Sequence, residues 1–396
     1  MSDRTMRRSL TDVTSLLRRG TAPSYVDHSV VRVVGQRCVQ TDGFRAEAAR
    51  PHSPRALSGS LVANFGDVLL NSTGAGTIGR SCVFNVDGIY VVDSHVTVLR
   101  ARPDIVEPRW IDLILRSPAG QRYLESHCFV GSTNQTELSR SELGKFQILT
   151  PPIMEQRRII SALDDLLRLK KSIGSSIAKW MNVRRGELDR TFGCGAGSHE
   201  YSIVPLESVA QISGGLTLGA SIAGIGGVDI PYMRVANVQD GYIDTRDMKS
   251  VRVTAADVQK FRLKSGDVLL TEGGDIDKLG RGGVWDGRID PCLHQNHIFR
   301  VRCFRSKMIP EYLALYLMSR PGRDYFMSMA KQTTNLASIS LSQVKVMPIP
   351  RPSISEQARI VELFASYDLM IKEEQRELSK LEKVEQGILM DALRDW

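Results

Sequence analysis

The sequence predicts an α+β protein made of two tandem-duplicated globules, which are separated and joined by two long antiparallel coiled-coil helices. Three observations lead to this fold class. Blocks of sequence recur in the same order about 200 residues apart. Each copy contains short β-branched runs punctuated by glycine, and each copy ends in a proline-led helical pattern. With 396 residues, 42% of them hydrophobic, the chain is long enough to build two cores.

The duplication is visible as short blocks at a nearly constant offset. "PPIMEQRRII" begins at Pro151 and "RPSISEQARIV" begins at Arg351, while "GDVLL" occurs at 66–70 and again at 266–270. Each copy also carries one amphipathic helical stretch before its last strand, "EPRWIDLILRSPAGQRYLES" in the first and "PEYLALYLMSRPGRDYFMSM" in the second. Further matched pairs are Gly79-Arg80 with Gly280-Arg281, His95 with His297, and Tyr123 with Tyr325.

The repeat defines five segments. We expect a first globule at 1–150, a first long helix at 151–191, a glycine-rich linker at 192–200, a second globule at 201–350 and a second long helix at 351–396. In this arrangement each globule is followed by its own long helix.

Both long helices carry a heptad seam, which needs a partner helix to cover it. An ordinary amphipathic helix lying on its own globule is the alternative. Rods over 155–189 and 355–393 would be about 50–60 Å long, whereas a 150-residue globule has a radius of gyration of only about 15 Å. We therefore expect the rods to pack against each other, with Lys170 at the one skipped apolar position of the first. The residues assigned to the helix pair and to partner docking are Glu155, Gln156, Ile159, Leu163, Leu166, Ile173, Ile177, Trp180, Glu356, Gln357, Ile360, Phe364, Tyr367, Ile371, Leu378 and Leu381.

Charge and composition indicate the kind of partner and the compartment. The net charge of +8 is largely an excess of arginine, and this favours an acidic partner, most often nucleic acid. The six cysteines form no C-x-x-C pair, "MSDRTMRRSL" has no apolar signal core, and no apolar run approaches the roughly 18 residues of a membrane span. We expect a cytoplasmic protein with reduced thiols.

Three short motifs suggest enzyme chemistry but lack its context. "GAGTIG" at 74–79 fits a dinucleotide fingerprint, yet a strand-like "RSCVFNVDGIYVV" follows where a helix would have to begin. "CLHQNH" brings Cys292, His294 and His297 close in sequence, but strand alternation separates them, so packed or hydrogen-bonded histidines are expected rather than a metal site. "EGGDIDK" at 272–278 has no acidic counterpart in the first half. The sequence predicts a binding module without catalytic residues or a metal of its own.

Two variable globules that alternate with two proline-led "EQ-R-I" helices resemble the specificity subunit of type I restriction–modification enzymes. The resemblance covers nearly the whole chain. It rests on "GDVLL", on "GSTNQTELSRSELGKFQILTPP" and "TTNLASISLSQVKVMPIPRPS", and on both helices. It implies that each globule is a target-recognition domain for one half of a split DNA site, and that the helices are the spacer. The first globule departs from the pattern, because "SDRTMRRSLTDVTSLLRRG" differs from "YSIVPLESVAQISGG" at the equivalent place.

The resemblance also implies partners and cofactors. Two methyltransferase (modification) subunits with S-adenosylmethionine would dock on the helices and methylate adenine, and a restriction/translocase subunit with ATP and Mg would cleave; this chain would bind none of these cofactors itself. The alternative is a stand-alone DNA-binding scaffold or orphan specificity protein that occupies a site, or supports another defence complex, without methyltransferase partners.

Within the globules, loop arginine, lysine and amide side chains are the candidate contacts to double-stranded DNA, because they neutralise phosphates and read base edges. The matched stretches 132–135 and 333–335 could instead cap or turn the chain before the last strand. The candidate DNA-binding residues are Arg37, Arg80, Ser132, Thr133, Asn134, Gln135, Arg234, Asn237, Lys278, Arg281, Thr333, Thr334 and Asn335.

Overall fold

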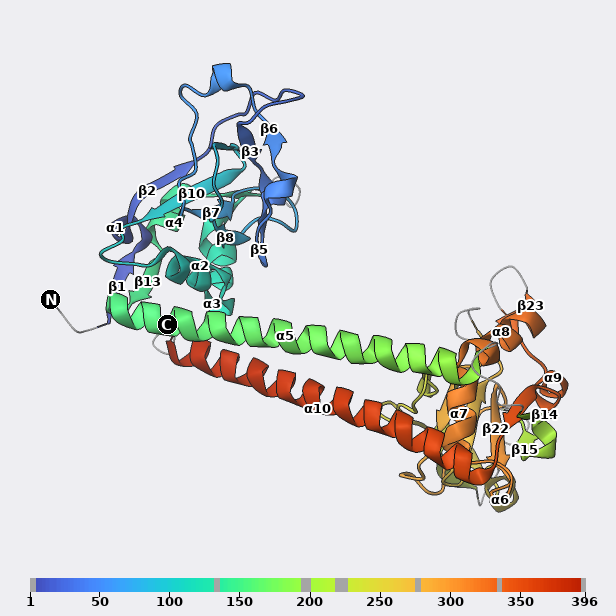
Figure 1. The fold of residues 1–396 in the computed structure, drawn as a ribbon. Helices are drawn as coiled ribbons and strands as arrows, with labels where there is room; N and C mark the ends of the chain where they lie inside the picture. Colours follow the sequence, from blue (N-terminus) through green and yellow to red (C-terminus); the bar gives the residue numbers. More distant parts are fainter. Residues whose placement is uncertain are drawn as a thin grey trace. The chain divides into compact units, whose positions relative to one another are not determined.

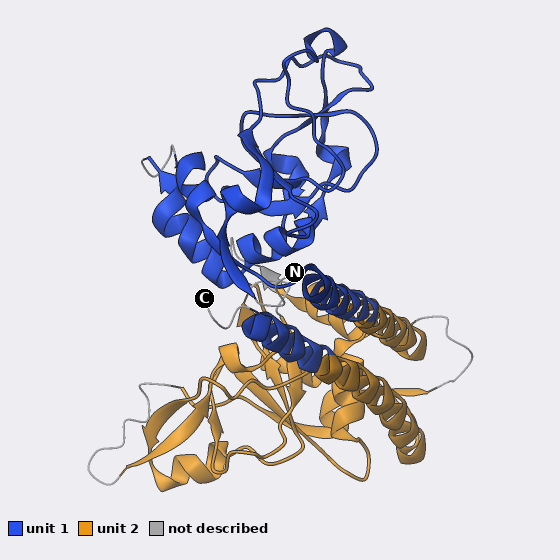
Figure 2. Ribbon diagram, turned by 90° about the vertical axis from the view of Figure 1, so that its left-hand side faces the viewer, with its two compact units in different colours: residues 1–172, 378–396 blue, residues 173–377 orange. Residues whose placement is uncertain are grey.

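The fold is drawn in Figure 1 from a computed structural model, which describes residues 5–131, 136–193, 201–217, 227–274, 279–332 and 337–392. The described chain divides into two compact units (Figure 2). Unit 1 comprises residues 1–172 and 378–396, and unit 2 comprises residues 173–377. Each unit contains one α+β globule, which we call globule 1 (1–150) or globule 2 (201–350), together with parts of both long helices.

Globule 1 is built on a four-stranded antiparallel sheet of order β2-β10-β7-β8, with helix α2 on one face and α3 packed against α2. A smaller sheet of order β6-β3-β9 contains a parallel pair between β3 and β9. The element bounds are β1 (Met6–Ser9), α1 (Leu10–Val13), β2 (Thr14–Arg19), β3 (Arg32–Val34), β4 (Val39–Gln40), β5 (Gly43–Phe44), β6 (Arg50–Pro51), β7 (Val68–Asn71), β8 (Ser81–Val83), β9 (Tyr90–Val92), β10 (Val96–Ala101), α2 (Pro108–Arg116), α3 (Pro118–Tyr123), β11 (Phe129–Val130), β12 (Glu137–Leu138), α4 (Arg140–Lys145) and β13 (Gln147–Thr150).

Globule 2 repeats this plan. Its four-stranded sheet has the order β15-β22-β18-β20, and its smaller sheet, β17-β16-β21, again contains one parallel pair. The element bounds are β14 (Ser202–Pro205), β15 (Ala210–Ser213), β16 (Val228–Met233), β17 (Lys249–Val253), α6 (Ala255–Phe261), β18 (Asp267–Thr271), β19 (Gly273–Gly274), β20 (Gly282–Val284), β21 (Leu293–His294), β22 (Ile298–Cys303), α7 (Pro310–Met318), α8 (Arg320–Met329), β23 (Lys331–Gln332), β24 (Ala337–Ser338), α9 (Leu341–Lys345) and β25 (Pro348–Arg351).

The four-stranded sheet of each globule contains one ion pair with a buried aspartate, and in both globules this aspartate belongs to the "GDVLL" block. Asp67 is 1% exposed and accepts two hydrogen bonds of 2.8 Å from the guanidinium of Arg100. Asp267 is also 1% exposed and accepts two bonds of 2.7 Å from Arg302. A bidentate arginine offsets much of the cost of burying a carboxylate. The duplicated sequence therefore specifies duplicated internal chemistry as well as duplicated strand order.

The two long helices are α5 (Ile153–Phe192) and α10 (Ile354–Ala392). Every predicted seam side chain on both helices is buried or half-buried. Those nearest the helix starts, Ile159, Ile360, Phe364 and Tyr367, pack in or against the cores of the globules. The helices run antiparallel. In unit 1, Lys170 Nζ donates to Glu385 Oε2 at 2.6 Å, and in unit 2, Arg184 Nε donates to Asp368 Oδ1 at 2.6 Å. Lys170, the break in the apolar seam, thus has an acidic partner on the other helix.

The charges of the helices are complementary. Helix α5 has nine basic and five acidic residues, whereas α10 has five basic and nine acidic residues. Their net charges are therefore of equal size and opposite sign. This favours pairing of α5 with α10 over pairing of either helix with a copy of itself.

Gln156 and Gln357 hold each helix start to its own globule, and their assignment to partner docking is wrong. Both side chains are 0% exposed. Gln156 Oε1 accepts from Glu107 N at 2.9 Å, while its Nε2 donates to the carbonyls of Ile105 and Pro151. Gln357 makes the equivalent three bonds, to Ile309 N and to the carbonyls of Lys307 and Pro352. The recurrent glutamine is therefore a structural clamp.

We expect Gln156→Ala to lower the free energy of unfolding by about 1–3 kcal/mol, because a buried amide hydrogen and two carbonyls lose their partner. Glu155→Ala is the matched control, since the ion pair of Glu155 with Arg158 is exposed and of a kind worth less than about 1 kcal/mol. Urea unfolding of the two variants measures the difference. Equal stability of both variants would contradict the clamp.

Candidate nucleic-acid interface

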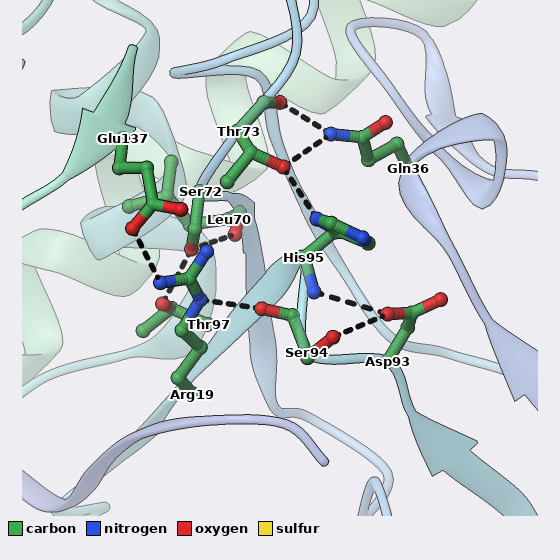
Figure 3. A network of polar contacts seen from close by, with 10 residues as sticks. All are labelled: Arg19, Gln36, Leu70, Ser72, Thr73, Asp93, Ser94, His95, Thr97 and Glu137. Carbon is green, nitrogen blue, oxygen red and sulfur yellow. Dashed lines mark hydrogen bonds and ion pairs between the residues drawn. The ribbon is translucent and has the colours of Figure 1, made fainter. Parts of the chain in front are cut away.

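Four segments of globule 1 that are distant in sequence meet at one edge of the fold (Figure 3). They are the 3-10 turn Gln36–Cys38, the loop 72–80 between β7 and β8, the turn 93–95 between β9 and β10, and the β11–β12 hairpin. Main-chain bonds join the loop, the turn and the hairpin, because Ser72 N donates to the carbonyl of His95 at 2.8 Å and Leu138 N donates to that of Ser72 at 2.8 Å. We call this assembly edge 1.

Side chains complete edge 1 (Figure 3). Gln36 Nε2 donates both to the carbonyl and, at 2.7 Å, to the hydroxyl of Thr73, and that hydroxyl lies 2.8 Å from His95 Nδ1. Arg19 donates to the carbonyl of Ser94 and, at 3.1 Å, to the carboxylate of Glu137 at the base of the hairpin. The network fixes the loop, the turn and the hairpin to one another before any ligand binds.

Globule 2 has an equivalent assembly, edge 2. Glu272 N donates to the carbonyl of His297 at 3.0 Å, and Ile339 N donates to the carbonyl of Glu272 at 2.9 Å, matching the two main-chain bonds of edge 1. Two side-chain contacts of edge 2 differ in chemistry from those at the matching positions of edge 1. Glu272 Oε2 lies 2.8 Å from His297 Nδ1, and Val235 N lies 3.4 Å from Gln295 Oε1. The hairpin of edge 2 is formed by β23 and β24, and it is held by β19, which pairs with β24.

The structure brings the described candidates to these edges. Arg37 is exposed on the 3-10 turn of edge 1. Arg80 ends the loop 72–80, is half-buried, and donates to Gln40 Oε1 at 2.9 Å and to the carbonyl of Gly76 at 2.6 Å. Arg281 occupies the equivalent place, because Thr271 N bonds to its carbonyl as Asn71 N bonds to that of Arg80. The candidates outside the described residues are Ser132, Thr133, Asn134, Gln135, Lys278, Thr333, Thr334 and Asn335.

Asn237 and Arg234 form a turn rather than a reading surface. Asn237 is 4% exposed, its Oδ1 accepts from Arg234 N at 2.9 Å, and its Nδ2 donates to the carbonyls of Asp244 and Asp247. Arg234 donates to Asp247 Oδ2 at 2.8 Å. Because the amide of Asn237 is fully engaged inside the globule, base contact by this residue does not agree with the structure.

The motifs that suggested enzyme chemistry have structural explanations. Strand β8, not a helix, follows "GAGTIG", so no helix N-terminus is present to hold a pyrophosphate. Cys292 and His294 are fully buried, His294 Nδ1 lies 3.1 Å from the carbonyl of Phe261, and burial lowers the pKa of His294 to about 4. The expectation of a packed, hydrogen-bonded His294 is therefore confirmed. Among the described residues, no group of His, Cys, Asp and Glu has the arrangement of a metal site.

Four residues that build the edges, His95, His297, Arg19 and Gln36, are not among the DNA-binding candidates predicted from the sequence. His95 and His297 stand out in the sequence as a matched pair but were not assigned to the interface. Arg19 and Gln36 have no counterpart at the matching positions in the second half, which are Gly214 and Val235. A search for side chains that repeat between variable loops would have identified the histidines. Nothing in the sequence indicates the other two.

The edges sit on basic globules. Residues 1–150 and residues 201–350 each contain 18 basic and 14 acidic side chains, so both globules carry the same positive excess. Such an excess favours a polyanionic ligand. Among the described residues, no helix is both long enough and apolar enough to cross a membrane. Fold and edges together define a chain of two α+β globules in which the same edge is built twice.

Comparison with known sequences places the chain in a family. Residues 59–178 and 199–383 match the type I restriction modification DNA specificity domain, and the chain belongs to this family. It is 24% identical over 289 residues to the EcoKI specificity subunit of Escherichia coli K12, which covers 66% of this chain and 60% of that subunit. It is 27% identical over 192 residues to the putative MjaX specificity subunit of Methanocaldococcus jannaschii, covering 48% of this chain and 44% of the relative. The matches thus span less than two thirds of these relatives' lengths.

Solved structures agree on the fold. A chain from a study of complex assembly and conformational transition of the type I R-M system superimposes with a TM-score of 0.63 at 18% identity, covering 99% of this chain and 98% of that chain. The type I restriction-modification S subunit from M. genitalium gives a TM-score of 0.56 at 14% identity, with coverage of 100% and 97%. Two globules with two long helices are therefore the architecture of this family, as the sequence predicted.

Proposed function

We propose that this chain is the DNA sequence-specificity subunit of a type I restriction–modification complex, and that each globule reads one half of a bipartite DNA target. The observation that carries the proposal is the duplicated edge: the same loop, turn and hairpin, joined by the same two main-chain bonds, recur on two basic globules of one chain. Two equivalent edges fit two half-sites, as in other proteins whose symmetry matches a split site. The helices between them would set the gap.

The helices also supply a place for two copies of one partner. Each long helix carries two exposed apolar residues at the heptad position next to the seam. Unit 1 presents Leu169 and Val384, which are 47% and 48% exposed, and unit 2 presents Met370 and Val183, which are 42% and 40% exposed. By the repeat offset Leu169 matches Met370, and Val183 matches Val384. We call these pairs patch 1 and patch 2.

Two equivalent patches support the docking of two methyltransferase subunits through apolar helix packing. Those subunits would carry S-adenosylmethionine, and a restriction/translocase subunit would use ATP and Mg. The chain itself would recognise DNA and transfer no methyl group. A stand-alone DNA-binding scaffold is the second candidate, because the duplicated edge would serve it equally well, but it leaves the matched apolar patches without a role.

We expect Leu169→Asp with Val384→Asp to reduce the complex from two methyltransferase subunits to one, because two charges would enter an apolar contact. Co-purification followed by native mass spectrometry counts the subunits. Ser172→Asp is the matched control, since it adds one charge on the exposed outer face of α5 and should keep two partners. Retention of both partners by the double variant would rule out patch 1, and absence of any partner for the unaltered chain would favour the stand-alone scaffold.

A further inference from the structure

The repeated histidines His95 and His297 are held in the same way but by different chemistry. Both side chains are exposed, and in both the Nδ1 atom lies 2.8 Å from an oxygen of the glycine-rich loop. That oxygen is the hydroxyl of Thr73 in edge 1 and the carboxylate of Glu272 in edge 2. The imidazole atom Nε2 is thereby fixed in place at each edge. In a neutral histidine, the bond made by one ring nitrogen decides whether the other carries the proton.

In edge 1 the neighbouring bonds favour one arrangement of the protons (Figure 3). The carbonyl of Thr73 can only accept, so the Gln36 atom facing it is the amide nitrogen, and this nitrogen also donates to the Thr73 hydroxyl. The hydroxyl, which accepts from Gln36, has one hydrogen left to donate, and His95 Nδ1 is the partner at 2.8 Å. Donation of this hydrogen to Nδ1 favours the tautomer of neutral His95 that carries its proton on Nε2, which is then a hydrogen-bond donor.

In edge 2 the same reasoning gives the opposite tautomer. An ionised carboxylate only accepts, so Glu272 requires a proton on His297 Nδ1. Neutral His297 then offers an unprotonated Nε2, which is an acceptor. The Asn296 amide nitrogen lies 3.4 Å from this atom, a long contact that a shorter bond from a ligand can replace. The two edges thus present opposite hydrogen-bonding groups at matched positions.

We propose that His95 and His297 contact DNA, one in each half-site, and that the loop residue bound to Nδ1 sets the polarity of the contact. This inference rests on the proposed function. His95 would donate to an acceptor on a base edge, such as purine N7, guanine O6 or thymine O4. His297 would accept from an exocyclic amino group, which only adenine N6 and cytosine N4 present in the major groove. Edge 2 would therefore prefer adenine or cytosine at the contacted position.

The tautomers can be measured without DNA. Nitrogen-15 NMR of the full chain labelled on histidine, recorded at alkaline pH where histidine is neutral, separates protonated from unprotonated ring nitrogens. We expect the proton on Nε2 of His95 and on Nδ1 of His297, with His95→Gln and His297→Gln assigning the signals. Glu272→Gln should move His297 towards the Nε2-protonated form, because the amide can donate to Nδ1. The same tautomer at both histidines of the unaltered chain would overturn the proposal.

The contacts are tested by methylation of a randomised DNA library by the assembled complex. His95→Gln should relax preference only in the first half-site, and His297→Gln only in the second, each by roughly tenfold at one position. His28→Gln, an exposed histidine of globule 1 outside the network, is the control and should change nothing. If the unaltered complex methylates a bipartite site and both edge variants keep its full preference, the histidine contacts are refuted while the proposed function stands. If the unaltered complex has no bipartite site, the proposed function fails and the DNA role of the histidines fails with it.

Discussion

A matched insertion of four residues into both long helices is expected to lengthen the recognised gap by one or two base pairs while both half-sites keep their sequence. The insertions follow Ile173 in α5 and Glu377 in α10, between the cross-helix contacts Lys170–Glu385 and Ser176–Glu374. Four residues add about 6 Å of helix, close to two base pairs at a rise of about 3.4 Å. The expectation follows from the proposed role of the helix pair as the ruler between half-sites.

The number four is chosen for rotation as well as length. Four residues exceed one helical turn of 3.6 residues by about 40°, in the same right-handed sense in which DNA turns over one or two base pairs. Because both helices gain the same insertion, Ser176 still faces Glu374 and Arg184 still faces Asp368. The seam is interrupted only locally, as stutters in coiled coils are.

Insertion into α5 alone is the contrasting variant. It moves Ser176 and Arg184 one turn away from Glu374 and Asp368, so it should lower the melting temperature, whereas the matched insertion should not. Methylation-aware sequencing of DNA treated with the assembled complex gives the gap directly. A folded matched variant that methylates the original site at its original spacing would show that the helices do not set the distance.

The fold could be predicted because the information for it is duplicated. "GDVLL" encodes a buried strand whose Asp67 or Asp267 pairs with an arginine on the neighbouring strand, and this pairing occurs in both halves. The heptad seams are also legible, because period and length together exclude a helix lying on one small globule. Such features depend on local pattern and on repetition, and both are visible in a single sequence.

The site was predictable only in part, because the role of a polar residue depends on which distant segments meet it. Gln156 looks like an exposed residue at a helix start, but the chain folds so that Glu107 N and the carbonyl of Ile105 reach it. Asn237 resembles a base-reading amide, yet its own turn uses both of its amide hydrogens and binds its Oδ1 atom. The polarity of His95 depends on Gln36, which lies 59 positions away in the sequence. Periodicity contains no information on such contacts.

Exchange of globule 2 is expected to change half of the DNA target completely. Replacing residues 197–350 with the equivalent region of a relative should substitute the second half-site, because edge 2 lies wholly within this segment. The first half-site and the gap should stay as they were, since edge 1 and both long helices are untouched. The expected loss of methylation at the original site is large, because each mismatched base pair costs about 1–3 kcal/mol and several change together.

The clamp at the junction defines how the exchange must be made. Gln357 binds Ile309 N and the carbonyl of Lys307, which both lie in the exchanged region, so the inserted region has to present the same two main-chain groups to it. A second variant that exchanges residues 1–150 instead should change only the first half-site. The pair of exchanges controls for a general loss of specificity in either chimaera.

The most direct test of a two-headed reader is therefore the methylated motif of each chimaera, determined by methylation-aware sequencing with the same methyltransferase subunits. The account predicts two bipartite motifs, each sharing one half-site and the gap with the motif of the unaltered chain. A chimaera that alters both half-sites at once, or leaves both unchanged, would contradict it.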